Sequence, residues 1–156
     1  MTPAILLLKR TRTAHAIHSY EHDSKAPSYG LEAAEKLQLD PERVFKTLLA
    51  QTETGELLVG IVPVSGSLDL KALAHAAHCK KCDMADPQAA QRSTGYLLGG
   101  ISPLGQKKPL RTFLDESAKA YTSIHVSAGR RGLEIELTAH DLITLCDGTF
   151  APISKS

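Results

Sequence analysis

The sequence predicts a mixed α/β (α+β) domain in which short strands, some of them antiparallel, alternate with helices around a mixed sheet. Segments with strand-like patterns alternate with segments of helical periodicity along the chain. Two strand pairs are separated by short turn sequences typical of antiparallel hairpins, which disfavours a purely parallel sheet. No internal repeat, low-complexity tract or composition shift divides the 156 residues, so we expect a single domain over residues 1–156.

The N-terminal part of the chain contains two helix-start signals. Thr2 is followed by Pro3, and Asp40 is followed by Pro41; in each pair a capping residue precedes a proline at the first helical position. The predicted elements in this part are a helix from Pro3, a strand over 15–20, a helix over 31–37, and a short helix from Pro41 that delivers Val44, Phe45 and Lys46.

The middle of the chain changes to strand patterns and then returns to helical spacing. The runs TLLAQ (47–51) and LLVGIVPV (57–64) flank the turn Glu53-Thr54-Gly55, which predicts a hairpin. A helix over 67–78, a strand over 82–85 and a helix over 88–91, started by Asp86 and Pro87, are predicted to follow.

The last third begins with a glycine-containing loop over 95–105. The runs TSIHVS (122–127) and LEIEL (133–137) alternate between apolar and polar residues on either side of the turn 128–132, which predicts a second hairpin. A helix over 139–145 is predicted to complete the domain.

Composition indicates a soluble, globular protein. Lys and Arg total 18 against 17 Asp and Glu, so the net charge of +1 provides no overall attraction to nucleic acid. No segment reaches the ~20 apolar residues that cross a bilayer, and no secretory signal is expected. Three cysteines are too few for a disulfide framework and fit the reducing cytoplasm. Contact with nucleic acid would need local basic groups, of which the candidates are Lys9, Arg10 and Arg12; Lys80 and Lys81; Lys107, Lys108 and Arg111; and Arg130 and Arg131.

One short segment has residue types that bind metals. His75, His78, Cys79 and Cys82 could supply a zinc site, and Cys79 and Cys82 form a C-x-x-C pair. The predicted helix ends near His78 and a strand follows, so the four side chains would not converge, and a redox C-x-x-C would precede a helix. We therefore expect no metal and no cofactor here.

Lys46 and the glycine pair Gly99-Gly100 are candidate site residues. A lysine at the junction of a helix and an apolar strand can place a point charge in a pocket, or it can be an exposed residue favoured by the helix dipole. The glycines can present backbone N–H groups to a carbonyl or phosphate, or they can form an ordinary turn. The residues alone leave both alternatives open.

Several separated motifs together resemble one family. Lys46-Thr47-Leu48, LDLKALA (68–74), MADP (84–87), STGYLLGGISPLGQKK (93–108) and SAGRRGLEIEL (127–137) occur in an order that resembles the YbaK/EbsC family of Cys-tRNA(Pro) deacylases. That family is related to the editing domain inserted in bacterial prolyl-tRNA synthetase. The resemblance runs nearly end to end and implies a partly barrel-like mixed sheet surrounded by helices.

The resemblance also implies a site and an activity. The family's lysine corresponds to Lys46, and the residues that correspond to the rest of the pocket are Tyr20, Thr47, Gly99, Gly100, Ser127 and Glu134. The implied activity is removal of cysteine from mischarged Cys-tRNA(Pro), with Cys-tRNA(Cys) left open as a second substrate, through attack of the substrate thiol on its own ester. Prolyl-tRNA synthetase is the implied partner.

Two positions depart from the family pattern. Relatives often have Ser-Gly-Gly where this chain has Ser127-Ala128-Gly129, and an aspartate is common where Glu134 stands.

The sequence leaves two other functions open. The chain could deacylate alanyl-tRNA, or another small mischarged amino acid, with activated water, or it could bind tRNA or a synthetase without catalysis.

Overall fold

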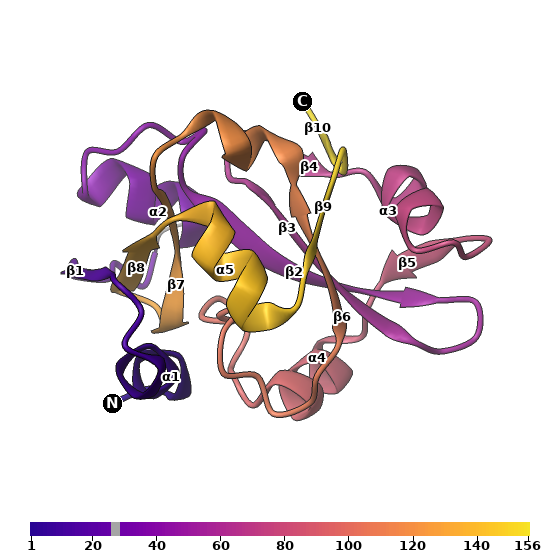
Figure 1. Ribbon diagram of the computed structural model, residues 1–156, viewed down its shortest axis with the longest axis horizontal. Helices are drawn as coiled ribbons and strands as arrows, with labels where there is room; N and C mark the ends of the chain where they lie inside the picture. The colour runs from indigo at the N-terminus through magenta and orange to yellow at the C-terminus, as the bar shows by residue number, and fades with distance from the viewer. Residues whose placement is uncertain (26–28) are drawn as a thin grey trace.

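The computed structural model describes residues 1–25 and 29–156 and contains a five-stranded mixed sheet at its centre (Figure 1). The strand order is β5-β2-β3-β6-β9. β2 pairs with β3 and β5 in antiparallel fashion, whereas β6 pairs with β3 and β9 in parallel. The strand bounds are Phe45–Thr52 for β2, Leu57–Pro63 for β3, Cys82–Met84 for β5, Arg111–Asp115 for β6 and Thr149–Ala151 for β9.

A second sheet has three antiparallel strands in the order β1-β8-β7. Its strands are β1 (Ala16–Ser19), β7 (Ile124–Arg130) and β8 (Leu133–Leu137), and a small sheet joins β4 (Ser67–Leu68) to β10 (Ser154–Lys155). A parallel bridge between Val44 and His125 links the three-stranded sheet to the start of β2. The sheets therefore curve around a shared interior, as the partly barrel-like prediction requires, but they do not close into a barrel within the described ranges.

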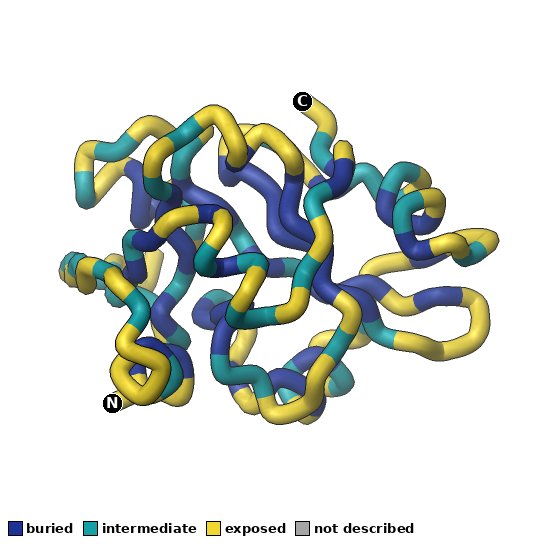
Figure 2. Tube along the Cα trace, in the orientation of Figure 1, coloured by how far each residue is buried: buried dark blue, intermediate teal, exposed yellow. Residues whose placement is uncertain are grey.

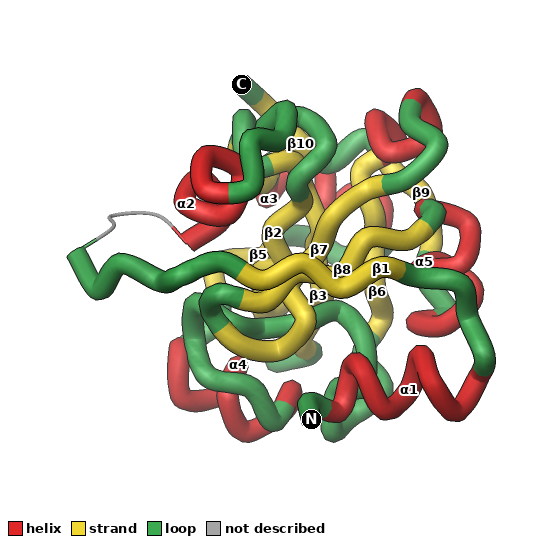
Figure 3. The backbone as a smooth tube through the Cα atoms, turned by 90° about the vertical axis from the view of Figure 1, so that its left-hand side faces the viewer, coloured by secondary structure: helices red, strands yellow, loops and turns green. Residues whose placement is uncertain are grey.

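Helices surround the sheets (Figure 3). They are α1 (Pro3–Thr11), α2 (Tyr29–Lys36), α3 (Leu70–Ala76), α4 (Pro87–Thr94) and α5 (Ala139–Cys146), with a 3-10 turn, η1, over Glu116–Ala120. Thr2 and Asp86 cap α1 and α4 by accepting hydrogen bonds from Ile5 N–H and Ala89 N–H, which confirms both predicted helix starts. In the part of the chain that the structure describes, no helix is long and apolar enough to span a membrane.

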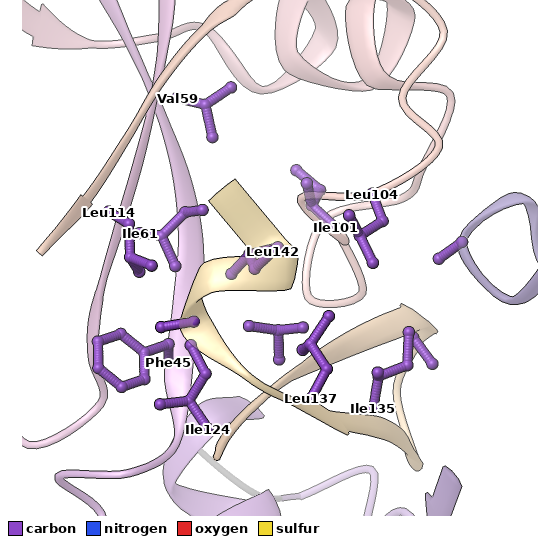
Figure 4. Packing of buried hydrophobic residues seen from close by; sticks show 14 of the residues in the cluster. Phe45, Val59, Ile61, Ile101, Leu104, Leu114, Ile124, Ile135, Leu137 and Leu142 are labelled. Carbon is purple, nitrogen blue, oxygen red and sulfur yellow. The ribbon is translucent and has the colours of Figure 1, made fainter. Parts of the chain in front are cut away.

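The core lies between the sheets and the helices, where the backbone is buried along the central strands (Figure 2). Leu142 of α5 packs against strand residues that include Ile61 and Leu114, and the loop residues Ile101 and Leu104 close the other side (Figure 4). The glycine-containing loop is therefore part of the core, and Ser127 of β7 donates a hydrogen bond to it at Gly100 O.

One predicted element is wrong. Residues 41–43 after Asp40 form a turn, not a helix, since Arg43 N–H donates to Asp40 O and the chain then enters the bridge at Val44. Lys46 consequently lies inside β2, not at the end of a helix. The helix predicted over 67–78 is shorter than expected, because Ser67 and Leu68 pair with β10 and Asp69 caps α3.

Four strands and η1 were not predicted. β6 lies between β3 and β9, yet its sequence RTFLD is short and carries a charge at each end. β4, β9 and β10 span two or three residues each, which is too short for an alternating pattern to be recognised. The other predicted helices and strands are confirmed, with ends that differ by a few residues.

Candidate functional site

A cavity of about 410 Å³ opens where the three-stranded sheet meets the start of β2 and the glycine-containing loop. This volume is within the range of small-molecule sites. The lining comes from α2, β2, β7, β8, the residue after β1, the β7–β8 turn and the loop after α4. It consists of Tyr20, Tyr29, Gly30, Phe45, Lys46, Thr47, Leu48, Leu98, Gly99, Ile101, Ser127, Arg130, Arg131 and Glu134. Six of the seven residues predicted to form the site therefore lie around one cavity.

Strand register explains why these residues meet. Glu134 of β8 lies opposite Ser127 of β7 on one side and opposite His18 of β1 on the other, so the three side chains share one face of the sheet. Lys46 is two residues beyond Val44, which bridges to His125 on β7. The alternation of side chains along β2 therefore directs Lys46 to the same side as Ser127 and Glu134.

Lys46 is a partly buried cation in this cavity. Burial lowers the pKa of its ammonium group, because the charged form loses hydration. In residues 1–25 and 29–156, no carboxylate lies within ion-pair distance of Lys46. Its charge is therefore available to a ligand.

Glu134 is the carboxyl group of the cavity lining. Burial raises its pKa to about 8, and its residue is 6% exposed. At neutral pH the side chain is predominantly a protonated carboxylic acid, which can donate a hydrogen bond. The cavity thus combines the Lys46 cation with a neutral acid.

The hydroxyl groups around the cavity have different environments. The Ser127 hydroxyl donates to Gly100 O at 3.2 Å and accepts from Gly129 N–H at 3.1 Å, so it fastens the glycine pair to β7. The Thr47 hydroxyl is buried without a hydrogen-bond partner among the described residues. Tyr20 is partly buried, and burial raises the pKa of its phenol, so it stays neutral. Among the described residues, the Ser127 hydroxyl hydrogen-bonds to backbone groups and to no side-chain base that could activate it.

The two glycines of the loop differ in their positions. Gly99 lines the cavity with φ +87°, and a Cβ there would lie 2.6 Å from the Tyr29 ring. Gly100 is buried behind it, and its N–H donates to Leu97 O at 3.1 Å. A Cβ on Gly100 would meet the Arg130 backbone at 2.7 Å. Close packing of the loop therefore requires glycine at both positions, at Gly99 against Tyr29 of α2 and at Gly100 against β7.

Sequence reasoning missed part of the cavity wall. Tyr29 and Gly30 begin α2, whereas Arg130 ends β7 and Arg131 lies in the β7–β8 turn. The Arg131 guanidinium carbon lies 3.6 Å from the centre of the Tyr29 ring. The arginine pair was recognised only as a basic group, and nothing in the local sequence connects it to Tyr29, about a hundred residues earlier.

In the described part of the chain, a group of metal-ligating residue types lies away from residues 75–82: three strands bring together donor atoms of His18, His125 and Glu136 within 4.8 Å of one another. The Glu136 carboxylate already accepts from His18 at 2.9 Å, and the Arg43 guanidinium lies 3.7 Å from it. The carboxylate is thus engaged by His18 and Arg43. His125 is 1% exposed, and neither ring nitrogen has a partner among the described residues.

The aminoacyl-tRNA editing domain model matches residues 25–145, which include nearly all of the cavity lining. The chain belongs to the family of aminoacyl-tRNA editing domains. Within this family the chain is 41% identical over 121 residues to "Putative Cys-tRNA(Pro)/Cys-tRNA(Cys) deacylase EbsC" of Enterococcus faecalis, covering 78% of this chain and 74% of the relative. It is also 28% identical over 94 residues to a proline–tRNA ligase of Brachyspira hyodysenteriae, covering 59% of this chain but 16% of that enzyme.

Solved structures share the fold of this editing domain. A crystal structure described as "a putative trans-editing enzyme for prolyl tRNA synthetase" has a TM-score of 0.84 at 20% identity, covering 100% of this chain and 99% of the other. A crystal structure of the hypothetical protein APE2540 has a TM-score of 0.87 at 17% identity, with coverage of 99% and 100%. The mixed architecture predicted from the sequence is therefore confirmed, and the family resemblance stated from the motifs is confirmed with it.

Proposed function

We propose that this editing domain acts in trans, in the cytoplasm, as a deacylase that removes cysteine from mischarged Cys-tRNA(Pro). The observation that carries the proposal is the composition of the cavity: an unpaired cation, Lys46, and a neutral acid, Glu134, with no Cys or His in the described lining. Such a site can orient an ester and stabilise developing charge, but it offers no activated nucleophile. A substrate that carries its own nucleophile suits it.

The cysteinyl group supplies that nucleophile. Its sulfur bonds to the ester carbonyl carbon, the bond from that carbon to the ribose oxygen breaks, and the thiol proton passes to the departing oxygen. The amino acid leaves as a cyclic thiolactone, which water then opens to free cysteine. The first step is an intramolecular acyl substitution that releases the tRNA without water, as a lyase would, and the two steps together amount to hydrolysis.

The residues of the cavity have separate roles in this scheme. Lys46 holds the ester end and the terminal ribose by its charge, and the Gly99 backbone faces the carbonyl. Glu134, as a neutral acid, donates to an oxygen of the substrate. Tyr20 and Thr47 line the cavity, while Ser127 positions the loop through Gly100.

This chemistry explains selection among small amino acids better than pocket shape does. A pocket separates side chains that differ by one small group by about 1–3 kcal/mol. A thiol, with a pKa of about 8.5, ionises far more readily than an alcohol, and alanine has no nucleophile. Selection therefore follows from the substrate's reactivity.

The protein alone binds the body of the tRNA weakly, and a partner protein strengthens this binding. The net charge is +1, and two residues of the predicted basic groups are engaged within the protein: Arg111 pairs with Glu56 at 2.8 Å and Arg131 with Glu32 at 3.5 Å. The remaining basic groups make binding sensitive to salt. We propose prolyl-tRNA synthetase, the enzyme that would mischarge tRNA(Pro), as the partner that delivers the substrate.

The decisive experiment compares Cys-tRNA(Pro), Ala-tRNA(Pro) and S-alkylated Cys-tRNA(Pro) under identical conditions. We expect release of amino acid from the free-thiol substrate alone. Release from the alanyl or the blocked substrate would overturn the thiol mechanism in favour of activated water. Binding of all three without release would identify a binding module instead of an enzyme.

A further inference from the structure

Arg131 is held in a fixed position at the cavity. Its guanidinium stacks on the Tyr29 ring, with 3.6 Å between the guanidinium carbon and the ring centre, and one terminal nitrogen lies 3.5 Å from a Glu32 oxygen. The Arg131 side chain is 19% exposed, and both Arg131 and Tyr29 line the cavity. Contacts on two sides therefore fix the plane of the guanidinium before any ligand arrives.

Glu32 is itself held firmly. Its side chain is 3% exposed, and its oxygens accept from His22 Nδ1 at 2.9 Å and from Asp23 N–H at 2.7 Å. Burial acts to raise the pKa of Glu32, but these hydrogen bonds outweigh burial and hold the pKa below its usual value. Glu32 is thus an ionised anchor on α2, and much of its hydrogen-bonding capacity is already used.

The Arg131 guanidinium keeps donors unused. Its Nε is buried and has no hydrogen-bond partner among the described residues, and the contact to Glu32 is long. A guanidinium presents a planar fork of N–H groups that matches phosphate or carboxylate oxygens. The other charges of the lining reinforce this preference, because Lys46 and Arg130 are cations while Glu134 is mostly neutral at pH 7.

We infer that Arg131 forms a phosphate-binding subsite, which takes the phosphodiester group preceding the terminal adenosine of the substrate. Lys46 then serves the ester end, and Arg131 serves the phosphate next to it. The inference rests on the proposed function for the identity of the anion. Tyr29 and Glu32 are positioning residues for Arg131, since they act on the substrate through the guanidinium.

A binding measurement tests the subsite without any catalysis. The probes are the dinucleotide CpA, which carries one phosphodiester, and adenosine, which carries none; affinity is measured by calorimetry or NMR titration. Arg131→Gln should weaken CpA binding about 10- to 100-fold, as expected for loss of a charge-assisted hydrogen bond, and leave adenosine binding unchanged. Arg10→Gln, at an exposed arginine outside the cavity lining, is the matched control for net charge and should change CpA affinity less than about threefold.

Two results of that titration would overturn the inference. Equal weakening of CpA binding in both variants would show a general charge effect, and equal weakening of CpA and adenosine binding would show that Arg131 holds the cavity shape. Circular dichroism establishes that each variant is folded. Arg131→Lys, which keeps the charge without the fork, should lie between Arg131→Gln and the unaltered protein.

Deacylation kinetics separate this inference from the proposed function. With Cys-tRNA(Pro), Arg131→Gln should raise KM about tenfold with a smaller change in kcat; with a 3′-cysteinyl adenosine that lacks phosphate, it should change neither. A larger effect on the phosphate-free ester would refute the subsite. If the unaltered protein binds CpA through Arg131 but releases no cysteine, the subsite stands and the deacylase proposal fails.

Discussion

The two larger sheets use buried positions in opposite ways. In the five-stranded sheet, every residue of β3 after Leu57 is buried, and the strand is apolar throughout. In the three-stranded sheet, the face that carries Ser127, Glu134 and His125 is polar, although Glu134 and His125 are as buried as core residues. The apolar interior of the first sheet supplies stability. The polar face of the second sheet carries buried groups such as His125, which costs stability because its ring nitrogens have no partner among the described residues.

The largest effect on activity should come from the cavity. Lys46→Ala should lower the deacylation rate about 10²- to 10³-fold, the range seen when one electrostatic contact to a transition state is lost. Because Lys46 has no ion-pair partner in the described structure, the free energy of unfolding should change by less than about 0.5 kcal/mol. Steady-state kinetics and urea denaturation measure the two quantities. Lys46→Met controls for the packing of the side-chain stem, and normal activity in either variant would refute the assignment.

The reverse behaviour is expected in the core of the five-stranded sheet, away from the cavity. Leu114 of β6 is fully buried and pairs with Ile61 of β3. Leu114→Ala should lower the free energy of unfolding by about 2–5 kcal/mol, because a cavity forms in the core. Activity per folded molecule, measured well below the melting temperature, should change less than about threefold. A loss of activity comparable to that of Lys46→Ala would remove the distinction between the two regions.

Glu134→Gln should increase stability, and the gain should depend on pH. The folded-state pKa of about 8 is above the ordinary value of 4.5, so folding takes up a proton between these pH values and the unaltered protein loses stability as pH rises through that window. Glutamine removes this loss. The gain in unfolding free energy should be small near pH 4 and about 4 kcal/mol near pH 8, as judged by urea denaturation across this range.

Glu136→Gln, on the same strand, should change the free energy of unfolding in the opposite direction. Hydrogen bonds from Ser123 and His18 lower the pKa of Glu136, so its charged form stabilises the fold above its ordinary pKa. This variant should therefore lose stability at neutral pH, and the difference should diminish on acidification. The same sign in both variants would contradict the assigned environments.

The smallest effect is expected from alanine substitution at two glycines that have similar backbone conformations. Gly99 has φ +87° and Gly55 has φ +91°, so alanine introduces comparable strain of about 1–2 kcal/mol at each. A Cβ at Gly99 would also collide with Tyr29, whereas at Gly55 the nearest atom is the end of Gln51, 3.9 Å away. Gly99→Ala should lower both stability and deacylation, and Gly55→Ala stability alone. Equal activities would show that the loop does not contribute to the site.

The sequence predicted the larger elements because their signals are local. Thr2-Pro3 and Asp86-Pro87 start α1 and α4, and the alternating runs around residues 53–55 and 128–132 form hairpins. The signal at Asp40-Pro41 failed because bridging of Val44 to His125 draws the chain into the sheet after one turn. β6 was not predicted, because parallel pairing with β3 and β9, which are distant along the chain, sets its place in the sheet.

Family motifs identified six residues of the cavity lining. They did not identify the part of the wall that Tyr29 and Arg131 form. Lys46, Thr47 and Glu134 lie in motifs that resemble the family, but Tyr29 and Arg131 meet through packing of α2 against the β7–β8 hairpin. The amino-acid sequence by itself determined the periodicities, the caps and the chemical groups available. The tertiary structure decided which groups lose water together, and therefore that Glu134 becomes a neutral acid and Lys46 an unpaired cation, because desolvation depends on neighbours that are distant along the chain.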